Sequence, residues 1–405
     1  MDAALRRQTL GDLLHRSAKR FPNKTAIICG DTAWSYAEFA TLCDRLAAGL
    51  AARGIGKGAR VAILARNSHA FAGLRFALAR LGAVLVPINF MLKAEEAAFI
   101  LKHAGAEMLA TDTGLAETAR AAAALGTKVR EFVWLPSEEK TAPAPGMIAF
   151  DELLSNSAEP PPVDLSGGDL AQFVYTSGTE SLPKGAMLTH DALIWQYVSC
   201  VVDASISTDD LALHALPLYH CAQLDAFLGP SIYVGGTNVI TAKPTPDNLL
   251  PLIERHRITS FFAPPTVWIS LLRSPLFDTT DLSSLKKGYY GASIMPGTGA
   301  VISSDGSQTN SRTLVPSPAA ARATSARPVS VASISAPACL RMKAASSALS
   351  MKLMGTSKAP SRASAKRKPA KAWLLRERTA TRAPLPMPRA ARPAARRSHI
   401  VSNSA

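Results

Sequence analysis

The chain has 405 residues, a length that at roughly 150 residues per domain predicts two to three domains. Hydrophobic residues make up 47% of the chain and charged residues 19%, a balance that excludes a wholly disordered protein. The formal net charge of +15 belongs to one segment: residues 297–405 contain 19 Lys and Arg but two acidic residues, whereas residues 1–296 contain 26 basic and 28 acidic residues.

The first predicted elements alternate between helix and strand. Apolar residues at helical spacing predict a helix over Leu10–Ala18, which Pro22 closes. The short apolar run Ala26–Cys29 predicts a strand. The stretch from Tyr36 to Arg53 is typical of a long amphipathic helix that ends at a glycine.

A strand–helix–strand unit follows, with strands at Val61–Leu64 and Val84–Pro87 and a helix at His69–Arg80 between them. Two strands joined in this way predict a parallel sheet with a right-handed crossover. Proline-rich residues 136–169 are expected to form a loop-rich link. The later expected strands are Phe173–Tyr175, Val239–Thr241 and Ser260–Ala263. We therefore expect an open α/β sheet.

The segment after Pro296 has a different composition. Ala, Ser, Pro, Lys and Arg make up 71 of the 109 residues 297–405, and Trp373 is the one aromatic residue there, against 24 in residues 1–296. Such a segment is expected to be disordered. Either it is a natural basic tail, or the reading frame has slipped, because a GC-rich gene read out of frame yields much Ala, Arg, Ser and Pro. The abrupt change favours a slipped frame.

Cysteine usage and hydropathy predict the compartment. No apolar run reaches the ~18 residues of a membrane-spanning helix, and the N-terminus lacks the apolar core of a signal peptide. The five cysteines show no C-x-x-C spacing, so neither a zinc site nor a disulfide framework is predicted. We expect a cytoplasmic protein without a transmembrane segment.

The stretch from Tyr175 to Gly185 concentrates hydroxyls, glycines and one lysine between two short apolar runs. Such a loop offers backbone N–H and hydroxyl donors to an anion, with one mobile cation for phosphate oxygens. It is not a Walker loop, because Pro183 precedes Lys184 and Gly185 follows it. The alternative is a simple polar hairpin loop. Ten consecutive positions with residue types that suit phosphate binding disfavour it. The candidate phosphate-binding residues are Thr176, Ser177, Gly178, Thr179, Glu180, Ser181, Lys184 and Gly185.

This stretch resembles the phosphate-binding loop of the AMP-forming acyl-CoA synthetases, in the adenylate-forming (AMP-binding) superfamily shared with luciferases and nonribosomal-peptide adenylation domains. The pattern is hydroxyl-Gly-hydroxyl, two variable positions and Pro-Lys-Gly, with Glu180 and Ser181 where Thr-Gly is commoner. The resemblance extends over residues ~10–296. It implies an α/β fold: an incomplete N-terminal large domain of the adenylate-forming type over residues 1–296, followed by a disordered basic tail over residues 297–405.

Two further segments resemble parts of the same family. Leu216–His220 is similar to the segment that lines the carboxylate and acyl pocket, with His220 at its mouth, although a lone histidine is more often structural. Tyr290–Ser293 is similar to the segment that passes adenine and the acyl group, where Gly291, Ala292 and Ser293 permit close approach; a simple turn is the alternative. His220 and Asp225 also match the H-x-x-x-x-D pair of glycerol-type acyltransferases, but no partner motif accompanies them.

The resemblance implies ATP-dependent activation of a medium- or long-chain fatty acid to an acyl-adenylate and then to acyl-CoA, with ATP and CoA as substrates and Mg²⁺ as the metal. The family's Tyr-Gly-x-Thr-Glu and Thr-Gly-Asp segments and its late catalytic lysine have no counterpart in this sequence. No catalytic residue or metal ligand is therefore assigned, and we expect the chain to be inactive.

The alternative interpretation is a non-catalytic nucleotide-binding module whose basic tail binds nucleic acid or acidic surfaces. Under the leading interpretation the partners are small molecules, and no specific nucleic acid is expected. The sequence predicts neither the particular acid nor the oligomeric state.

Overall fold

The computed structural model describes residues 8–154, 159–176 and 183–291 with their side chains, and residues 332–334 as backbone. Contacts divide the chain into two units, residues 1–355 and 356–405. All the described residues belong to the first unit.

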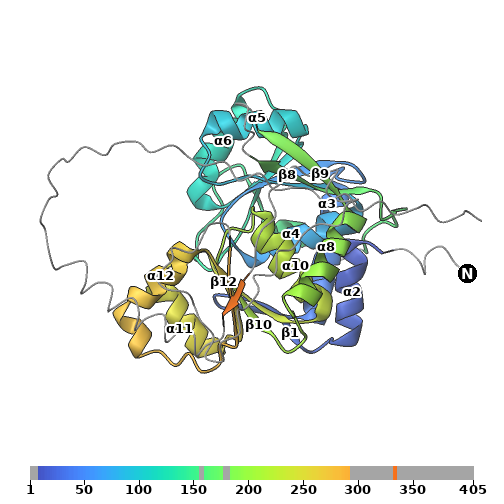
Figure 1. Ribbon diagram of the computed structural model, residues 1–405. Helices are drawn as coiled ribbons and strands as arrows, with labels where there is room; N and C mark the ends of the chain where they lie inside the picture. The colour runs from blue at the N-terminus through green and yellow to red at the C-terminus, as the bar shows by residue number, and fades with distance from the viewer. Residues whose placement is uncertain (1–7, 155–158, 177–182, 292–331, 335–405) are drawn as a thin grey trace, which may run out of the picture. The chain divides into compact units, whose positions relative to one another are not determined.

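The described residues form two seven-stranded sheets (Figure 1). The first has the order β7-β6-β5-β3-β4-β8-β9. Its neighbouring strands are parallel, except that β8 and β9 form an antiparallel pair at one edge. Its strands are β3 (Arg60–Leu64), β4 (Val84–Pro87), β5 (Met108–Thr111), β6 (Glu131–Trp134), β7 (Ile148–Ala149), β8 (Leu170–Thr176) and β9 (Lys184–Thr189).

The second sheet has the order β14-β13-β12-β10-β11-β1-β2. Its five central strands are parallel, and the edge strands β2 and β14 are antiparallel to their neighbours. Its strands are β1 (Thr25–Cys29), β2 (Thr32–Ser35), β10 (Leu211–His214), β11 (Thr237–Ile240), β12 (Ser260–Ala263), β13 (Lys287–Tyr290) and β14 (Ala332–Ile334). Strand β1 therefore pairs with β11, a strand that follows the whole of the first sheet in the sequence, and β2 pairs with β1 at the edge.

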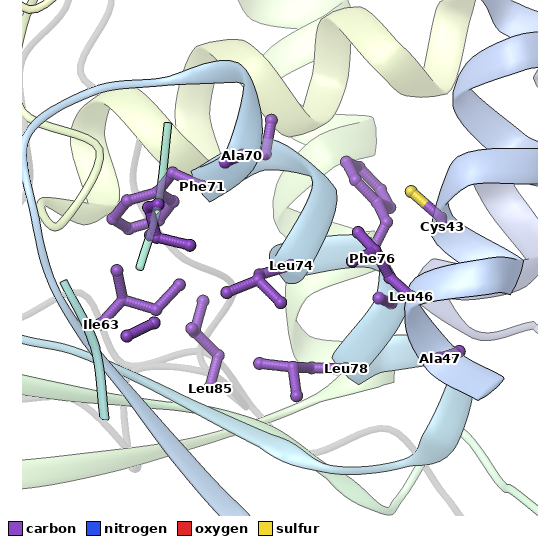
Figure 2. Packing of buried hydrophobic residues seen from close by; sticks show 14 of the residues in the cluster. Cys43, Leu46, Ala47, Ile63, Ala70, Phe71, Leu74, Phe76, Leu78 and Leu85 are labelled. Carbon is purple, nitrogen blue, oxygen red and sulfur yellow. The ribbon is translucent and has the colours of Figure 1, made fainter. Parts of the chain in front are cut away.

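Helices α3 (Tyr36–Ala52) and α4 (His69–Leu81) lie between the two sheets (Figure 1). Ser68 caps α4 by accepting the N–H of Phe71, and Gly82 ends it in the left-handed conformation at φ 68°. Every residue of α4 except Arg80 is buried, as expected for a helix enclosed on all sides. Figure 2 shows its apolar side chains packed against α3 and against Ile63 and Leu85 of the first sheet.

Two further pairs of helices cover the outer faces of the sheets. Helices α5 (Ala94–Ala104) and α6 (Ala116–Ala124) pack on the first sheet. Helices α11 (Pro246–His256) and α12 (Pro265–Arg273) pack on the second. The described residues thus form alternating layers of helix and sheet, in which the central parallel strands β4, β5, β11 and β12 are fully buried, as parallel sheets require.

The other helical elements pack around this framework. Helix α2 is tied to later segments, because Nδ1 of His190 accepts the N–H of Leu10 at 3.2 Å and the hydroxyl of Ser17 donates to the Ile232 carbonyl at 2.8 Å. These elements are α2 (Leu10–Arg20), α7 (Phe150–Leu154), α8 (His190–Asp203), α9 (Cys221–Gln223), α10 (Gly229–Val234), the π-helical turn η2 (Leu224–Leu228) and the 3₁₀ turns η1 (Thr113–Leu115) and η3 (Pro275–Asp278). No helix among the described residues is long and apolar enough to cross a membrane.

The structure confirms the α/β class and the elements expected from local pattern, and it corrects two expectations. There are two sheets rather than one, because local periodicity does not tell which strands pair. The link over residues 136–169 contains β7 and α7, whose Phe150 and Leu153 are buried. Of residues 297–405, the structure describes Ala332–Ile334, which form β14 beside β13; the rest of that segment lies outside the described residues, so its expected disorder stays a prediction.

Candidate functional site

The predicted phosphate-binding loop joins β8 to β9. Thr176 and Lys184 are directly opposite each other in the antiparallel pair, and both are exposed. They therefore form the base of the loop, with the lysine on one side and a hydroxyl on the other. The predicted residues between them (Ser177, Gly178, Thr179, Glu180 and Ser181) lie outside the described residues.

Gly185 has a packing role next to this base. It faces Tyr175 across the strand pair, and a Cβ atom at position 185 would lie 3.0 Å from the Tyr175 ring. The ring is held there by His103, whose Nδ1 lies 2.8 Å from the tyrosine hydroxyl. Burial raises the pKa of Tyr175 to about 12, so its hydroxyl stays protonated. The glycine after Lys184 thus lets the tyrosine cover the root of the loop.

The ends of three parallel strands bring the loop to one edge of the first sheet. Strands β3, β4 and β8 are parallel neighbours, so the residues that follow them emerge on the same side. Asn67 follows β3, Phe90 follows β4, and the loop follows β8. Ligands of open α/β sheets bind at this carboxyl edge.

The carboxyl edge of the second sheet lies beside the carboxyl edge of the first sheet and contacts it through Asn67. The side chain of Asn67 donates to the carbonyls of Leu216 and Thr241, at 2.7 and 3.0 Å, and accepts the N–H of Leu218 at 2.7 Å. The rings of Phe90 and Tyr219 pack edge to face, with centroids 5.2 Å apart. The segment before His220 is therefore fixed beside the first sheet.

His220 caps the short helix α9. Its Nδ1 accepts the N–H of Ala222 at 3.1 Å, so in the neutral ring the proton is on Nε2, and that atom is available as a donor. Part of the side chain is exposed. Desolvation lowers the pKa of His220, and the charge of Asp225 offsets part of this effect. At neutral pH the imidazole is a neutral hydrogen-bond donor at the mouth of the junction between the sheets.

The geometry does not support a His–Asp acid–base pair at His220 and Asp225. Such a pair needs the carboxylate on Nδ1 of the histidine, but this atom accepts the Ala222 N–H. The Asp225 carboxylate instead bonds to Arg75, Gln172 and Tyr197. The acyltransferase alternative requires contact between His220 and Asp225, and the structure does not have it.

The third predicted segment ends β13. Gly291 directly follows this strand and is buried, at the same carboxyl edge of the second sheet as the segment that leads from β10 to His220. The structure therefore brings Gly291 and His220 to one edge, whereas Ala292 and Ser293 lie outside the described residues.

Sequence reasoning missed the residues that hold these parts together. Asn67, which joins the two edges, gives no signal in the sequence beyond a polar residue in a loop. Arg75 and Gln172 did leave a signal in the sequence that could have been used. Each is a charged or amide side chain in the middle of an otherwise apolar helix or strand. Buried polar groups of this kind need specific partners.

Three buried histidines have lowered pKa values. Burial lowers the pKa of His69, His190 and His214 to about 4. His214, at the end of β10, has Nδ1 2.6 Å from the amide of Gln223 and Nε2 2.9 Å from Oδ1 of Asn238. These bonds suit a neutral ring that accepts at one nitrogen and donates at the other.

We expect the free energy of unfolding to fall as the pH drops from about 6.5 to 4. Each of these three histidines binds a proton in the unfolded chain near pH 6.5 but not in the folded chain above about pH 4, so the unfolded state gains protons as the pH falls. Each contributes on the order of 1–3 kcal/mol to this loss. Urea unfolding across this pH range measures the slope. The variant His69→Phe should flatten the slope, because it removes one of the three titrating groups. The substitution breaks no hydrogen bond at Nδ1, since this buried atom has no partner. An unchanged slope would contradict the assignment of the pH dependence to these histidines.

The described residues do not fit a metal site. No group of three His, Cys, Asp or Glu side chains in residues 8–154, 159–176 and 183–291 could hold a metal ion. The Mg²⁺ implied by the resemblance is therefore assigned to none of these residues, and no step below passes through it.

The chain is similar in sequence to one described family and to several curated proteins. Residues 14–301 match the family described as AMP-binding enzyme. A feruloyl-CoA synthase from Amycolatopsis sp is 36% identical over 292 residues, 72% of this chain and 56% of that protein. An indoleacetate–CoA ligase from Aromatoleum aromaticum is 33% identical over 289 residues, 71% of this chain and 56% of that protein. The chain thus spans little more than half the length of these curated relatives.

Solved structures share the fold. The N-terminal domain of FACL13 from Mycobacterium tuberculosis aligns with a TM-score of 0.64 and 28% identity, over 71% of each chain. A Mycobacterium tuberculosis fatty acyl CoA synthetase aligns with a TM-score of 0.62 and 29% identity, over 69% of this chain and 53% of that one.

Proposed function

The chain belongs to the AMP-binding enzyme family, and we propose that it binds ATP through the loop between β8 and β9 and a carboxylate substrate beside His220. The observation that carries the proposal is the junction of the two carboxyl edges, where Asn67 fixes the His220 segment beside the strands that lead to the loop. A phosphate on the loop and a carboxylate at His220 would then be neighbours. Holding two reactants in this way is a main source of rate in such chemistry.

In the proposed first step, a carboxylate oxygen attacks the α-phosphorus of ATP, an acyl-adenylate forms and pyrophosphate leaves. In the second step, the thiol sulfur of CoA attacks the acyl carbon, loses its proton, and AMP leaves. Lys184 would neutralise phosphate charge, and the Nε2–H of His220 would donate to a carboxylate oxygen. The contributions of these residues are position and charge, which dominate phosphoryl-type transfer.

For the acid, we propose a medium- or long-chain fatty acid, supported by the family resemblance and by the similarity to a fatty acyl CoA synthetase. Aromatic acids are the competing class, because two relatives are named for ferulate and indoleacetate. Non-hydrolysable acyl-sulfamoyl adenosines carrying decanoyl, feruloyl or indoleacetyl groups distinguish the classes in a thermal-shift assay of the 405-residue chain. We expect decanoyl to raise Tm most. A larger shift with an aromatic acid would replace the fatty acid, and no shift with any of them would contradict the site.

We further expect the 405-residue chain to release no pyrophosphate and to form no acyl-CoA. The family's metal-binding, ribose-binding and lysine segments have no counterpart in this sequence, and losing groups that act as a unit leaves little residual rate. A pyrophosphate-release assay with decanoate, ferulate, ATP, Mg²⁺ and CoA measures this. Turnover above a no-enzyme blank would contradict the expectation.

A slipped reading frame near residue 297 is our explanation for this lack. It is supported by the composition change after Pro296 and by a family match that ends at residue 301. Translation of the other two frames from codon 297 should yield segments like Tyr-Gly-x-Thr-Glu and Thr-Gly-Asp and a late lysine, in that order. A chain rebuilt in that frame should turn over in the same assay, and it is the matched control for the inactive chain. If neither frame contains these segments, the basic tail is genuine.

A genuine tail would favour the second candidate, a non-catalytic nucleotide-binding module. Residues 297–405 carry 19 basic residues against Asp305 and Glu377, a charge that suits phosphate backbones or acidic surfaces. Salt-dependent retention of the full chain on DNA-cellulose, lost when the chain stops at residue 296, would support this candidate.

A further inference from the structure

A buried ion pair joins two elements of the interior. Arg75 of α4 and Asp225 of η2 are 3.3 Å apart between a guanidinium nitrogen and a carboxylate oxygen, with 2% and 4% of their side chains exposed. Removing two charges from water costs about as much free energy as their attraction returns, so apolar residues would serve stability as well. The pair therefore calls for an explanation other than stability.

Two more hydrogen bonds extend the pair to further elements. The Nε2 amide of Gln172 in β8 donates to Oδ2 of Asp225 at 2.9 Å. The hydroxyl of Tyr197 in α8 lies 3.4 Å from the other carboxylate oxygen. The Asp225 carboxylate thus connects four elements: α4, β8, α8 and η2.

Both ends of the Gln172–Asp225 bond lie on irregular backbone. The register of β8 shifts between Leu170 and Gln172, so that an extra residue on β8 is placed against β9. Such a bulge re-aims a side chain, and the amide of Gln172 is fully buried as a result of its orientation toward the interior. At the other end, Asp225 lies in a π-helical turn, a distortion often found at functional sites.

The bond also connects the two halves of the proposed site. Gln172 lies four positions before Thr176 at the base of the loop, along one strand. Asp225 follows His220 within two connected helical turns, and the carbonyl of His220 accepts the N–H groups of Gln223 and Leu224 at 3.1 Å. This bond therefore links β8 to the His220 turn from the interior, in addition to the contacts of Asn67.

We propose that Gln172 is a positioning residue, which through Asp225 sets the place of the His220 turn relative to Thr176 and Lys184 at the base of the loop. The proposal rests on the proposed function for the identity of the ligands, but the structural link can be measured without them. Gln172 itself touches neither ligand; it aligns the groups that do.

The test compares Gln172→Met, which removes the donor at similar length, with Tyr36→Phe. The control also loses one buried hydrogen bond, from Tyr36 to the carbonyl of Gly236 at 2.6 Å, but at the second sheet. In the full-length chain with ¹⁵N-labelled histidine, and with His220 assigned through His220→Gln, we expect Gln172→Met to move the His220 imidazole signals. Tyr36→Phe should leave them unchanged.

Ligand binding supplies the second readout. Decanoyl-sulfamoyl adenosine spans both halves, so its affinity should fall about tenfold in Gln172→Met, whereas ATP alone should lose less than twofold. A purely structural role would weaken both ligands equally. Unmoved His220 signals, or equal loss for both ligands, would overturn the proposal. If the parent chain binds neither ligand, the proposed function fails, and the histidine signals alone decide the inference. Should Gln172→Met not fold, Gln172→Asn, which shortens the amide by one methylene, is measured in its place.

Discussion

Replacing Lys184 with alanine is expected to weaken the binding of a fluorescent ATP analogue at least tenfold. The lysine stands at the base of the loop, opposite Thr176 in the β8–β9 pair, and it is exposed to solvent. A charge-assisted contact to a phosphate contributes about 1.5–3 kcal/mol, and 1.4 kcal/mol corresponds to a factor of ten in affinity. Titration of the parent and the variant, followed by fluorescence anisotropy, measures the change.

Lys128→Ala is the matched control for this titration. Lys128 is also exposed, but it precedes β6 and so lies at the edge of the first sheet opposite to the loop. It should bind the analogue as the parent does, which separates a local contact from a change in net charge. Equal affinity in Lys184→Ala and the parent would remove Lys184 from the phosphate site.

Replacing Asp225 with leucine is expected to cost about 3–5 kcal/mol of the free energy of unfolding. The substitution leaves the guanidinium of Arg75 buried, with 2% of its side chain exposed and without its carboxylate. It also leaves the Gln172 amide without an acceptor. Urea unfolding followed by circular dichroism measures the loss, with a constant slope as evidence that the change is in stability alone.

The double variant Arg75→Met/Asp225→Leu separates the cost of an unpaired charge from the cost of the substitution. Since it removes both charges, it should recover most of the loss and unfold close to the parent. If the double variant is as unstable as Asp225→Leu, the Arg75–Asp225 pair stabilises the fold, and no positioning role is needed to explain it. The argument for Gln172 as a positioning residue would then weaken.

The elements of the fold could be predicted where local pattern and packing agree. Strands Val84–Pro87 and Ser260–Ala263 begin and end where the sequence predicts, and α4 extends one residue beyond its predicted end. In α4, a capping serine, an apolar interior and a terminal glycine all indicate the same bounds. The pairing of β1 with β11 could not be predicted, because parallel strands far apart in the sequence leave no local periodic signal.

The chemistry of the candidate site stays a prediction from the sequence, whereas its assembly could not be predicted at all. The residue types around Lys184 indicate phosphate, and this prediction depends on no knowledge of the fold. The junction at Asn67 depends on three hydrogen bonds between segments that follow strands of different sheets. An amide side chain in a loop has many possible partners, and the sequence does not distinguish among them.

The pairing of β1 with β11 has a consequence for synthesis on the ribosome. The amide of Asn238 donates to the carbonyl of Ala26, a partner 212 residues earlier in the chain. At 5–20 residues per second, the nascent β1 waits on the order of 10–40 s for its neighbour. The strands of the first sheet lie between residues 60 and 189 and can pair during that interval. The apolar segment Ala26–Ile28 therefore lacks its parallel partner strand throughout that interval, and a chaperone that covers it would keep it from pairing with another chain.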